Sequence, residues 1–332
     1  MLRRALLLIG LLWVLGCRDS AERPPPALQQ AEQGAPSPSA ISNWLNLGPA
    51  ASGQPPAPVS PAVTVRIIDS ISHQCRQNGS QITAPVRKVI LRLDFTDPDF
   101  SAHHQFGVFA VPHEGQNQKF RIDRALEEIR SEGHEAKSLI NGGFFFKNTV
   151  LSFYKSDLFH VAHPQNSARS EKRPCLVYHS ATNDFAIEES SASNFQAWNR
   201  ASSDLEVFCA GPLLVRNGVN VARARYAEEQ FQGSGVDQDS DLPRTGVCIT
   251  APGHIKIFVA DSPETSKHNV ICGTTLPQLA ELMKSEDCID GMGNDGGGST
   301  AFFTAASPGV PEFRLNGMED RPLPVWVGVF SR

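Results

Sequence analysis

The chain has 332 residues, with 40% hydrophobic and 20% charged side chains and a formal net charge of -5 at pH 7. This slightly acidic balance, without a basic stripe, argues against nucleic acid as a partner. The chain after residue 61 is long enough, at about 270 residues, to form one sizeable core. We therefore expect one folded domain over residues 62–332.

The chain starts with an expected export signal. Arg3 and Arg4 supply positive charge, and residues 5–15 form an apolar run too short to span a bilayer. The run leads into Leu15-Gly16-Cys17, which resembles the lipobox of bacterial lipoproteins, where Cys17 becomes the lipidated first residue. The alternative is a plain signal peptide in which Cys17 is incidental.

No aspartate directly follows Cys17, so the inner-membrane retention signal of the resembling lipoproteins is absent. We expect residues 1–17 to specify a lipid-anchored outer-membrane lipoprotein of a bacterial cell envelope, facing the periplasm or the surface. Residues 18–61 are rich in proline, alanine and glutamine. This composition cannot offset the entropy lost on ordering, so we expect a disordered, flexible linker.

The domain itself shows more strand patterns than helix patterns. Strands are expected at residues 63–68, 86–95, 106–111, 139–140, 207–215, 246–250, 255–260, 301–304 and 324–330. Helices are expected at residues 120–131 and 276–284, where apolar residues recur at helical spacing. Because helices and strands do not alternate regularly, we predict an α+β fold: a single domain built on a mixed, largely antiparallel sheet with a few helices.

Apart from Cys17, the chain has an even number of cysteines in what we expect to be an oxidising compartment. They are Cys75, Cys175, Cys209, Cys248, Cys272 and Cys288. Three disulfides can form, and the sequence alone does not select among the pairings. A zinc site is disfavoured because the cysteines are scattered singly.

The most informative segment is Gly293-Asn294-Asp295-Gly296-Gly297-Gly298-Ser299-Thr300. Glycines without Cβ atoms allow amide N–H groups to converge on an anion, and the two hydroxyls add donors beside them. The segment therefore predicts a site for a phosphate or a sugar. Residues 291–296 also satisfy GxGxxG, but the expected strand at 301–304 excludes the helix that a dinucleotide site requires.

Two further motifs allow a structural or a functional interpretation. Asn141-Gly142-Gly143 is typical of a tight hairpin turn, but it also delivers an amide side chain and two flexible peptides beside an aromatic run. Arg244 precedes Thr245 at the start of an expected strand. An isolated arginine is often a surface group, yet its planar fork of donors suits a phosphate, with Thr245 in support.

Five separated motifs agree in order with one family. They are Ile140-Asn141-Gly142-Gly143-Phe144-Phe145, Ala210-Gly211-Pro212-Leu213-Leu214-Val215, Pro243-Arg244-Thr245-Gly246, Asp295-Gly296-Gly297-Gly298-Ser299 and Arg321-Pro322. Together they resemble the phosphodiester glycosidase family, over residues 80–330. Gly293-Asn294 precedes the aspartate where that family usually has Asn-Leu, which leaves the identity of the sugar open.

The resemblance implies a hydrolase that cleaves a sugar-1-phosphate diester at the glycosidic C–O bond, on a cell-envelope or extracellular glycan or glycoconjugate. We expect Asp295 to stabilise positive charge at the sugar carbon or to activate water. Arg244 is expected to stabilise the phosphate, and Asn141 to hold hydroxyls or water. The expected substrate- or phosphate-binding residues are Gly142, Gly143, Thr245, Gly296, Gly297, Gly298, Ser299 and Thr300. The sequence requires no cofactor and no metal site, although it allows a divalent cation.

A second catalytic carboxylate is not identifiable, and Asp261 and Asp290 are the nearest candidates in sequence. Two other functions stay open. The domain could be a non-catalytic envelope lipoprotein that binds glycan or phosphoglycan, or a phosphodiesterase that cleaves the P–O bond.

Overall fold

The structure is a computed structural model, and it describes the following parts of the chain: residues 62–113, 116–147, 149–163, 172–201, 204–232, 234–263, 270–307, 310, 312–316 and 321–332. The expected signal segment 1–17 with Cys17 and the expected linker 18–61 lie outside the described residues.

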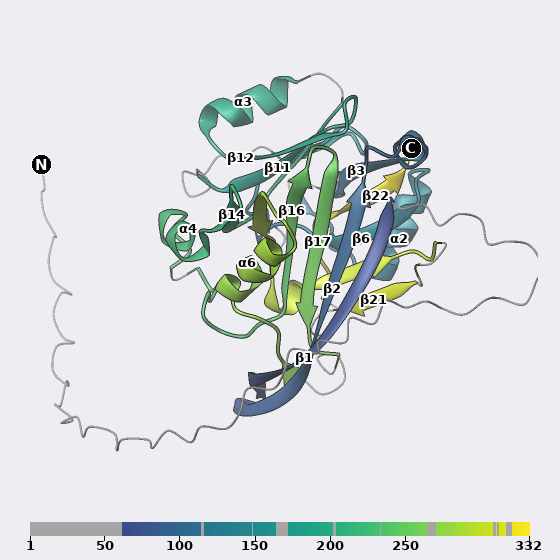
Figure 1. Cartoon of the computed structure of the whole chain (residues 1–332). Helices are drawn as coiled ribbons and strands as arrows, with labels where there is room; N and C mark the ends of the chain where they lie inside the picture. The colour runs from purple at the N-terminus through teal and green to yellow at the C-terminus, as the bar shows by residue number, and fades with distance from the viewer. Residues whose placement is uncertain are drawn as a thin grey trace, which may run out of the picture. The chain divides into compact units, whose positions relative to one another are not determined.

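An eight-stranded sheet forms the largest element, in the order β15-β14-β19-β16-β17-β2-β1-β18. Its strands are β1 (Val63–Gln77), β2 (Ser80–Asp94), β14 (Leu213–Arg216), β15 (Val219–Asn220), β16 (Arg244–Ala251), β17 (His254–Asp261), β18 (Val270–Ile271) and β19 (Asp290–Gly293). All pairings described for this sheet are antiparallel. In Figure 1, β1, β2, β17 and β16 lie side by side across the front of the domain.

Two five-stranded sheets complete the main framework. One has the order β10-β9-β13-β11-β12, with β9 (Tyr154–Ser156), β10 (Val161–His163), β11 (Pro174–His179), β12 (Asp184–Glu189) and β13 (Leu205–Cys209). The other has the order β21-β20-β6-β22-β3, with β3 (His104–Phe109), β6 (Ala136–Asn141), β20 (Ala301–Thr304), β21 (Phe313–Asn316) and β22 (Trp326–Ser331). Two short hairpins are added by β4 (Pro112–His113) with β5 (Gln116–Asn117), and by β7 (Phe145–Phe146) with β8 (Thr149–Val150).

Each of the three larger sheets packs against at least one helix. Helix α2 (Ile122–Ser131) places Ile122, Ala125 and Ile129 against the sheet that contains β6, because these residues share one helical face. Helices α4 (Ala222–Glu228) and α6 (Leu276–Ser285) pack on the eight-stranded sheet, and α3 (Ala192–Arg200) covers the sheet of β11. Figure 1 shows α4 and α6 on one side of the domain and α3 above it.

The largest hydrophobic cluster draws residues from all three sheets, including Leu91 of β2, Ile140 of β6 and Phe208 of β13. The sheets therefore enclose one common core. The predicted α+β fold, largely antiparallel, single-domain and with few helices, is confirmed.

The sequence prediction differs from the structure in several places, among them the strands β11 and β12, which were not predicted. The expected strand 207–215 is two strands, β13 and β14, which belong to different sheets, because the chain changes direction at Gly211. Gly211 has φ +132, and a Cβ there would lie 2.7 Å from Glu229 Oε2. Helix α3 and the short helices α1 (Pro98–His103) and α4 were not predicted, because each buries at most two residues and so shows little apolar periodicity.

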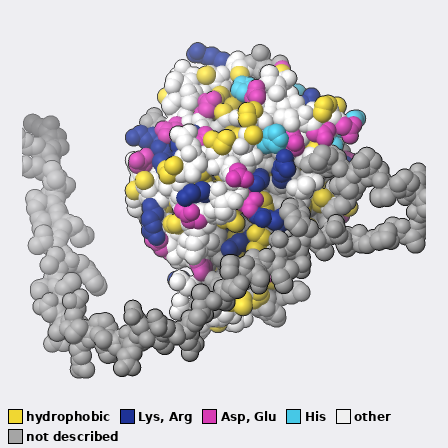
Figure 2. All heavy atoms as spheres, viewed as in Figure 1, with side chains coloured by type: hydrophobic (Ala, Val, Ile, Leu, Met, Phe, Trp, Pro, Cys, Tyr) yellow, Lys and Arg dark blue, Asp and Glu magenta, His cyan; other side chains and the backbone are white. Residues whose placement is uncertain are grey.

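Figure 2 shows basic and acidic side chains interspersed on the viewed face, without a continuous basic stripe. This distribution agrees with the small negative net charge. Among the described residues, no helix has the length and apolar character needed to span a membrane.

The six cysteines of the domain form three disulfides, Cys75–Cys272, Cys175–Cys209 and Cys248–Cys288. The first joins β1 to the segment that follows β18, and its two cysteines are 197 residues apart in the chain. The other two pairs are separated by 34 and 40 residues. Such bonds persist in oxidising compartments, so they indicate an exported protein.

We predict that the Cys75–Cys272 bond contributes most to stability among the three disulfides, because it closes the longest loop of the unfolded chain. The double variant Cys75→Ala/Cys272→Ala should lose about 2–5 kcal/mol of unfolding free energy. Calorimetry under oxidising conditions measures this, with Cys248→Ala/Cys288→Ala as the matched comparison. An equal or larger loss in the comparison variant would contradict the ranking.

Candidate active site

The Asp295 segment connects two sheets. It follows β19 in the eight-stranded sheet and leads through the short helix η2 (Gly297–Ser299) into β20 of a five-stranded sheet. Asn141 ends β6, the neighbour of β20 in that second sheet. The segment and Asn141 therefore meet where the two sheets join.

The side chain of Asn141 holds this junction together. Its Nδ2 donates to the carbonyl of Asp295 at 2.6 Å, while its Oδ1 accepts from the amide of Ala301 at 3.2 Å. The hydroxyl of Thr245 lies 3.0 Å from Asn141 Oδ1 and 2.9 Å from the Asp295 carbonyl oxygen. Asn141 is 1% exposed, so all its side-chain contacts are with the protein and its amide fixes the Asp295 backbone.

Asn294 supports the same junction from the other side. Its Nδ2 donates to the carbonyl of Asn141 at 3.0 Å, and its amide donates to the carbonyl of Thr245 at 2.9 Å. The hydrogen bonding is thus reciprocal, because each asparagine side chain binds the backbone of the segment that carries the other. The two buried amides join β6, β16 and β19 at one point.

Gly142 and Gly143 are buried because other segments pack directly against their backbone. A Cβ on Gly142 would lie 2.7 Å from Val325 Cγ1, and a Cβ on Gly143 would lie 2.5 Å from the carbonyl of Cys209. The carbonyl of Gly142 also accepts from the Asp295 amide at 3.2 Å. These glycines serve close packing behind the Asp295 segment, a role that their sequence motif alone did not distinguish from ligand binding.

The amides of the glycine segment are mostly engaged within the protein. The amide of Gly296 donates to Asp295 Oδ1 at 2.9 Å and that of Gly297 to the carbonyl of Pro243 at 2.8 Å. The amides of Ser299 and Thr300 donate to the carbonyls of Gly296 and Gly297. Within residues 295–300, the amide of Gly298 alone has no acceptor among the described residues. It is the backbone donor that this segment can offer to a ligand.

Asp295 is half-buried, and its carboxylate accepts hydrogen bonds from the Gly296 amide and the Ser299 hydroxyl. Burial raises the pKa of Asp295 to about 6, although Ser299, Gly296, Arg321 and Arg244 act in the opposite direction by favouring the ionised form. A carboxyl group with this pKa can exchange a proton near neutral pH, as a general acid or base requires.

Arg244 lies beside the glycine segment and is 4% exposed. Its Nε donates to the carbonyl of Thr274 at 3.2 Å, and its Nη2 donates to the carbonyls of Asp237 and, at 3.3 Å, Ser240. Nη1 faces Gly296, 3.6 Å from where a Cβ would stand. Burial lowers the pKa of Arg244 to about 10, opposed by Asp237 and Asp295, so the group stays cationic at neutral pH.

A second guanidinium, that of the exposed residue Arg321, acts electrostatically on the same carboxylate. Its Nη1 donates to Ser299 Oγ at 3.4 Å, and its Cζ lies 5.0 Å from the centre of the Phe145 ring. Arg321 was part of a family motif in the sequence, but it was not among the expected site residues. No local sequence pattern identifies Arg321 as a site residue, because its position relative to Asp295 depends on the placement of β20 and β22.

Two buried polar atoms flank Asp295 without a hydrogen-bond partner among the described residues, Thr300 Oγ1 and Asn294 Oδ1. Such atoms are costly to bury, and in native structures they concentrate at functional positions. Ser299, Thr300 and Thr245 are each at most 1% exposed. Of these, the Ser299 hydroxyl donates to the Asp295 carboxylate and the Thr245 hydroxyl to the Asp295 carbonyl.

The two carboxylates named as second candidates have different surroundings. Asp290, at the opposite end of β19, forms an ion pair with Arg216 at 3.1 Å and accepts from the Asn217 amide. Asp261 ends β17 next to Ala260, the residue paired with Arg244, and is 1% exposed. Within the part of the chain that the structure describes, no cluster of three His, Cys, Asp or Glu side chains could hold a metal ion.

The fold of the chain is similar to folds of known structure. The fold is similar to that of the zebrafish N-acetylglucosamine-1-phosphodiester alpha-N-acetylglucosaminidase catalytic domain, auto-inhibited by its pro-peptide, with a TM-score of 0.58 and 16% identity over 81% of this chain and 84% of that one. A hypothetical protein from Synechocystis aligns with a TM-score of 0.46 and 10% identity, over 81% and 62% of the two chains. No curated protein matches the sequence.

The family model for phosphodiester glycosidases matches residues 134–330, which include Asn141, Arg244, Asp295 and Arg321. The chain belongs to the phosphodiester glycosidase family, and it is a hydrolase.

We predict that Asn141→Ala destabilises the domain by about 3 kcal/mol, because it leaves buried backbone groups of the Asp295 segment without partners. Urea unfolding measures the loss. The matched control is Asn117→Ala, which removes another buried asparagine that donates to the Tyr154 hydroxyl at 2.7 Å. At urea concentrations below the unfolding midpoints of both variants, only Asn141→Ala should also lose activity. Equal activity losses in the two variants would contradict the role of Asn141 in positioning Asp295.

We predict that Asp295→Asn raises thermal stability at pH 8. The folded-state pKa of Asp295, about 6, lies above the unfolded value of about 4, so ionisation destabilises the wild type as the pH rises through this window. The melting temperatures should converge below pH 4. Asp290→Asn, which breaks the ion pair with Arg216, should gain nothing at any pH. A variant that melts below the wild type at pH 8 would refute the prediction.

Proposed function

We propose that this enzyme hydrolyses sugar-1-phosphate diesters at the glycosidic C–O bond, with Asp295 at the reaction centre. The observation that carries the proposal is the Asp295 carboxyl group, which accepts from the Gly296 amide and the Ser299 hydroxyl, has its pKa raised by burial to about 6, and is acted on by the positive charges of Arg244 and Arg321. The family supports glycosidic cleavage of a phosphodiester-linked sugar. The particular sugar and aglycone are part of the proposal.

In the proposed reaction, water adds to the anomeric carbon as the bond from that carbon to the phosphate oxygen breaks. The bonding electrons leave with the phosphate, so the products are a free sugar and a phosphomonoester. Ionised Asp295 stabilises the oxocarbenium-like carbon or takes a proton from the water. A carboxylate against the phosphate would be repulsive, which favours an orientation in which Asp295 faces the sugar.

Charge that develops on the phosphate needs donors on the other side of the scissile bond. Arg321, the Arg244 Nη1 group and the free Gly298 amide are suited to this task, because fixed donors aimed at developing charge lower the barrier. We assign Asn141, Thr245, Gly142 and Gly143 to holding the Asp295 segment in place. We assign Gly296 and Ser299 to binding the Asp295 carboxylate, and Gly297 and Thr300 to shaping the segment that carries it.

The proposed substrate is a cell-envelope or extracellular glycan, since the three disulfides indicate export. Anchoring through Cys17 at an outer membrane remains a prediction from the sequence. It would bring the domain close to envelope glycans. Labelling of cells with a radioactive fatty acid tests it: the wild-type protein should incorporate the label and fractionate with the outer membrane, whereas Cys17→Ala should incorporate none.

Hydrolysis in ¹⁸O-labelled water tests the bond that is cleaved. With nucleotide-sugars and aryl or alkyl sugar-1-phosphate diesters as substrates, mass spectrometry should find the label in the released sugar. Label in the phosphomonoester would instead establish a phosphodiesterase that cleaves the P–O bond. Failure to hydrolyse the whole panel, with saturable binding of a phosphodiester, would favour the non-catalytic binding protein.

We predict that Arg321→Ala lowers kcat/KM about 100-fold, because it removes a donor for the phosphate that few other groups can replace. The matched control is Arg314→Ala. Arg314 also lies over a phenylalanine ring, with its Cζ 5.2 Å from the centre of the Phe303 ring. Unlike Arg321, it forms ion pairs with Asp123 and Glu312. Steady-state kinetics should show the control within about two-fold of the wild type, and similar losses in both variants would remove Arg321 from the mechanism.

A further inference from the structure

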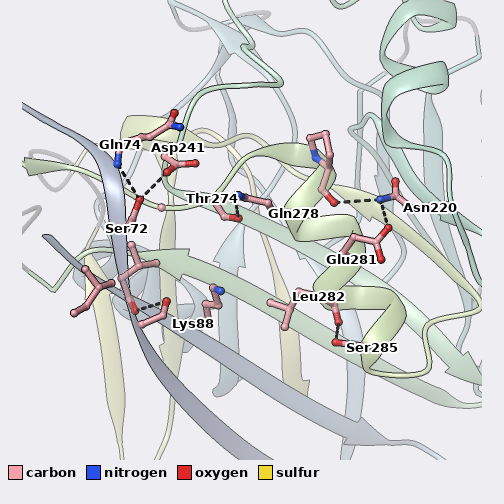
Figure 3. Close-up of a pocket in the computed structure, with 15 residues that line it drawn as sticks. Ser72, Gln74, Lys88, Asn220, Asp241, Thr274, Gln278, Glu281, Leu282 and Ser285 are labelled. Carbon is pink, nitrogen blue, oxygen red and sulfur yellow. Dashed lines mark hydrogen bonds between the residues drawn. The ribbon is translucent and has the colours of Figure 1, made fainter. Parts of the chain in front are cut away.

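A cavity of about 790 Å³ lies between β1, β2 and α6, separate from the Asp295 carboxylate. Its volume is within the range of small-molecule sites, about 300–1,000 Å³. Figure 3 shows side chains from β1, β2, α6 and the segment before β16 converging on it. None of the family motifs described above accounts for the polar groups of this cavity.

Several of these polar groups have free hydrogen-bonding capacity. Lys88 on β2 lines the cavity, and its ammonium group makes no hydrogen bond or ion pair within the described residues. Asp241 uses Oδ2 to accept from the Ser72 hydroxyl at 2.6 Å, which leaves Oδ1 for another donor. Gln278 uses Oε1 within the α6 cap, which leaves its Nε2 donors. The cavity therefore offers both donors and acceptors to a ligand.

The charge of the lining argues against a phosphate-rich ligand. Lys88 is the cation of the lining, whereas Asp241 and Glu281 both contribute carboxylates. A polyanion would therefore meet more negative than positive charge. A ligand with many hydroxyl groups suits such a lining, because each hydroxyl both donates and accepts.

The cavity also offers apolar surface. Ile71 is 69% exposed at its rim, and Leu282 and Val86 belong to the lining. The C–H faces of a sugar ring pack on apolar side chains while the ring hydroxyls bind polar groups, which is the amphipathic pattern that this cavity combines. From these features we propose that the cavity binds an uncharged oligosaccharide, as a second glycan site apart from the Asp295 centre.

The two sites share a wall. The carbonyl of Thr274 accepts from Arg244 Nε, and the side chain of Thr274 lines the cavity. The carbonyl of Ser240 accepts from Arg244 Nη2, next to Asp241. A glycan held in the cavity thus stays beside the reaction centre, which raises the effective concentration of its phosphodiester there. This use of the cavity rests on the proposed function, whereas the binding itself does not.

Calorimetric titration of the full chain tests the binding without any need for turnover. The probes are neutral tetrasaccharides of glucose, mannose, galactose and N-acetylglucosamine, with a phosphorylated mannose tetrasaccharide for comparison. We expect one-site binding of at least one neutral probe, weakened at least ten-fold in Lys88→Met. Asp295→Asn should bind as the wild type does, so failure of the proposed reaction would leave this result unchanged.

The matched control is Lys137→Met, because Lys137 is also half-buried on a strand but contacts Glu135. It should retain binding. Should Lys88→Met fail to fold, Ser285→Trp at an exposed position fills the cavity instead, and it should also abolish binding. Absence of binding by all neutral probes, binding of the phosphorylated probe alone, or full binding by Ser285→Trp would overturn the proposal.

Discussion

The side chain of one buried asparagine determines the geometry of the site. Asn141 ends a strand of one sheet and binds the backbone of Asp295 and Ala301, which connect the eight-stranded sheet to that sheet. Asn294 returns a hydrogen bond to the backbone of Asn141. Because both partners are buried, neither can exchange its hydrogen bonds for water at low cost. The position of the Asp295 carboxylate therefore follows from how the two sheets meet.

This constraint explains why a costly carboxyl group is tolerated. Burial of Asp295 disfavours its ionised form, and the Gly296 amide, the Ser299 hydroxyl and the two arginines offset that cost only in part. The rest of the domain, with its common core and three disulfides, supplies the stability that the site gives up. Such a balance between local cost and global stability is expected where an activity depends on a perturbed carboxyl group.

Much of this organisation could be predicted from the sequence. Periodicity located α2 and α6 and several strands, and the glycine motifs indicated the segments that meet at Asp295. Short-range patterns could not show that Gly142 and Gly143 face other backbone segments, because the packing partners Val325 and Cys209 are distant in the chain. The disulfide pairing, the division of 207–215 between two sheets and the approach of Arg321 to Ser299 depend on tertiary structure in the same way.

The most direct measurement is a titration of the Asp295 carboxyl carbon by NMR in protein labelled with ¹³C at aspartate carboxyl groups, assigned by comparison with Asp295→Asn. The proposed role of Asp295 requires a midpoint near pH 6, coincident with the acidic limb of kcat/KM, since the ionised group of the free enzyme is the active one. A midpoint at or below the ordinary aspartate pKa of about 4, or an acidic limb that does not follow the titration, would contradict the assignment of Asp295 to the reaction centre.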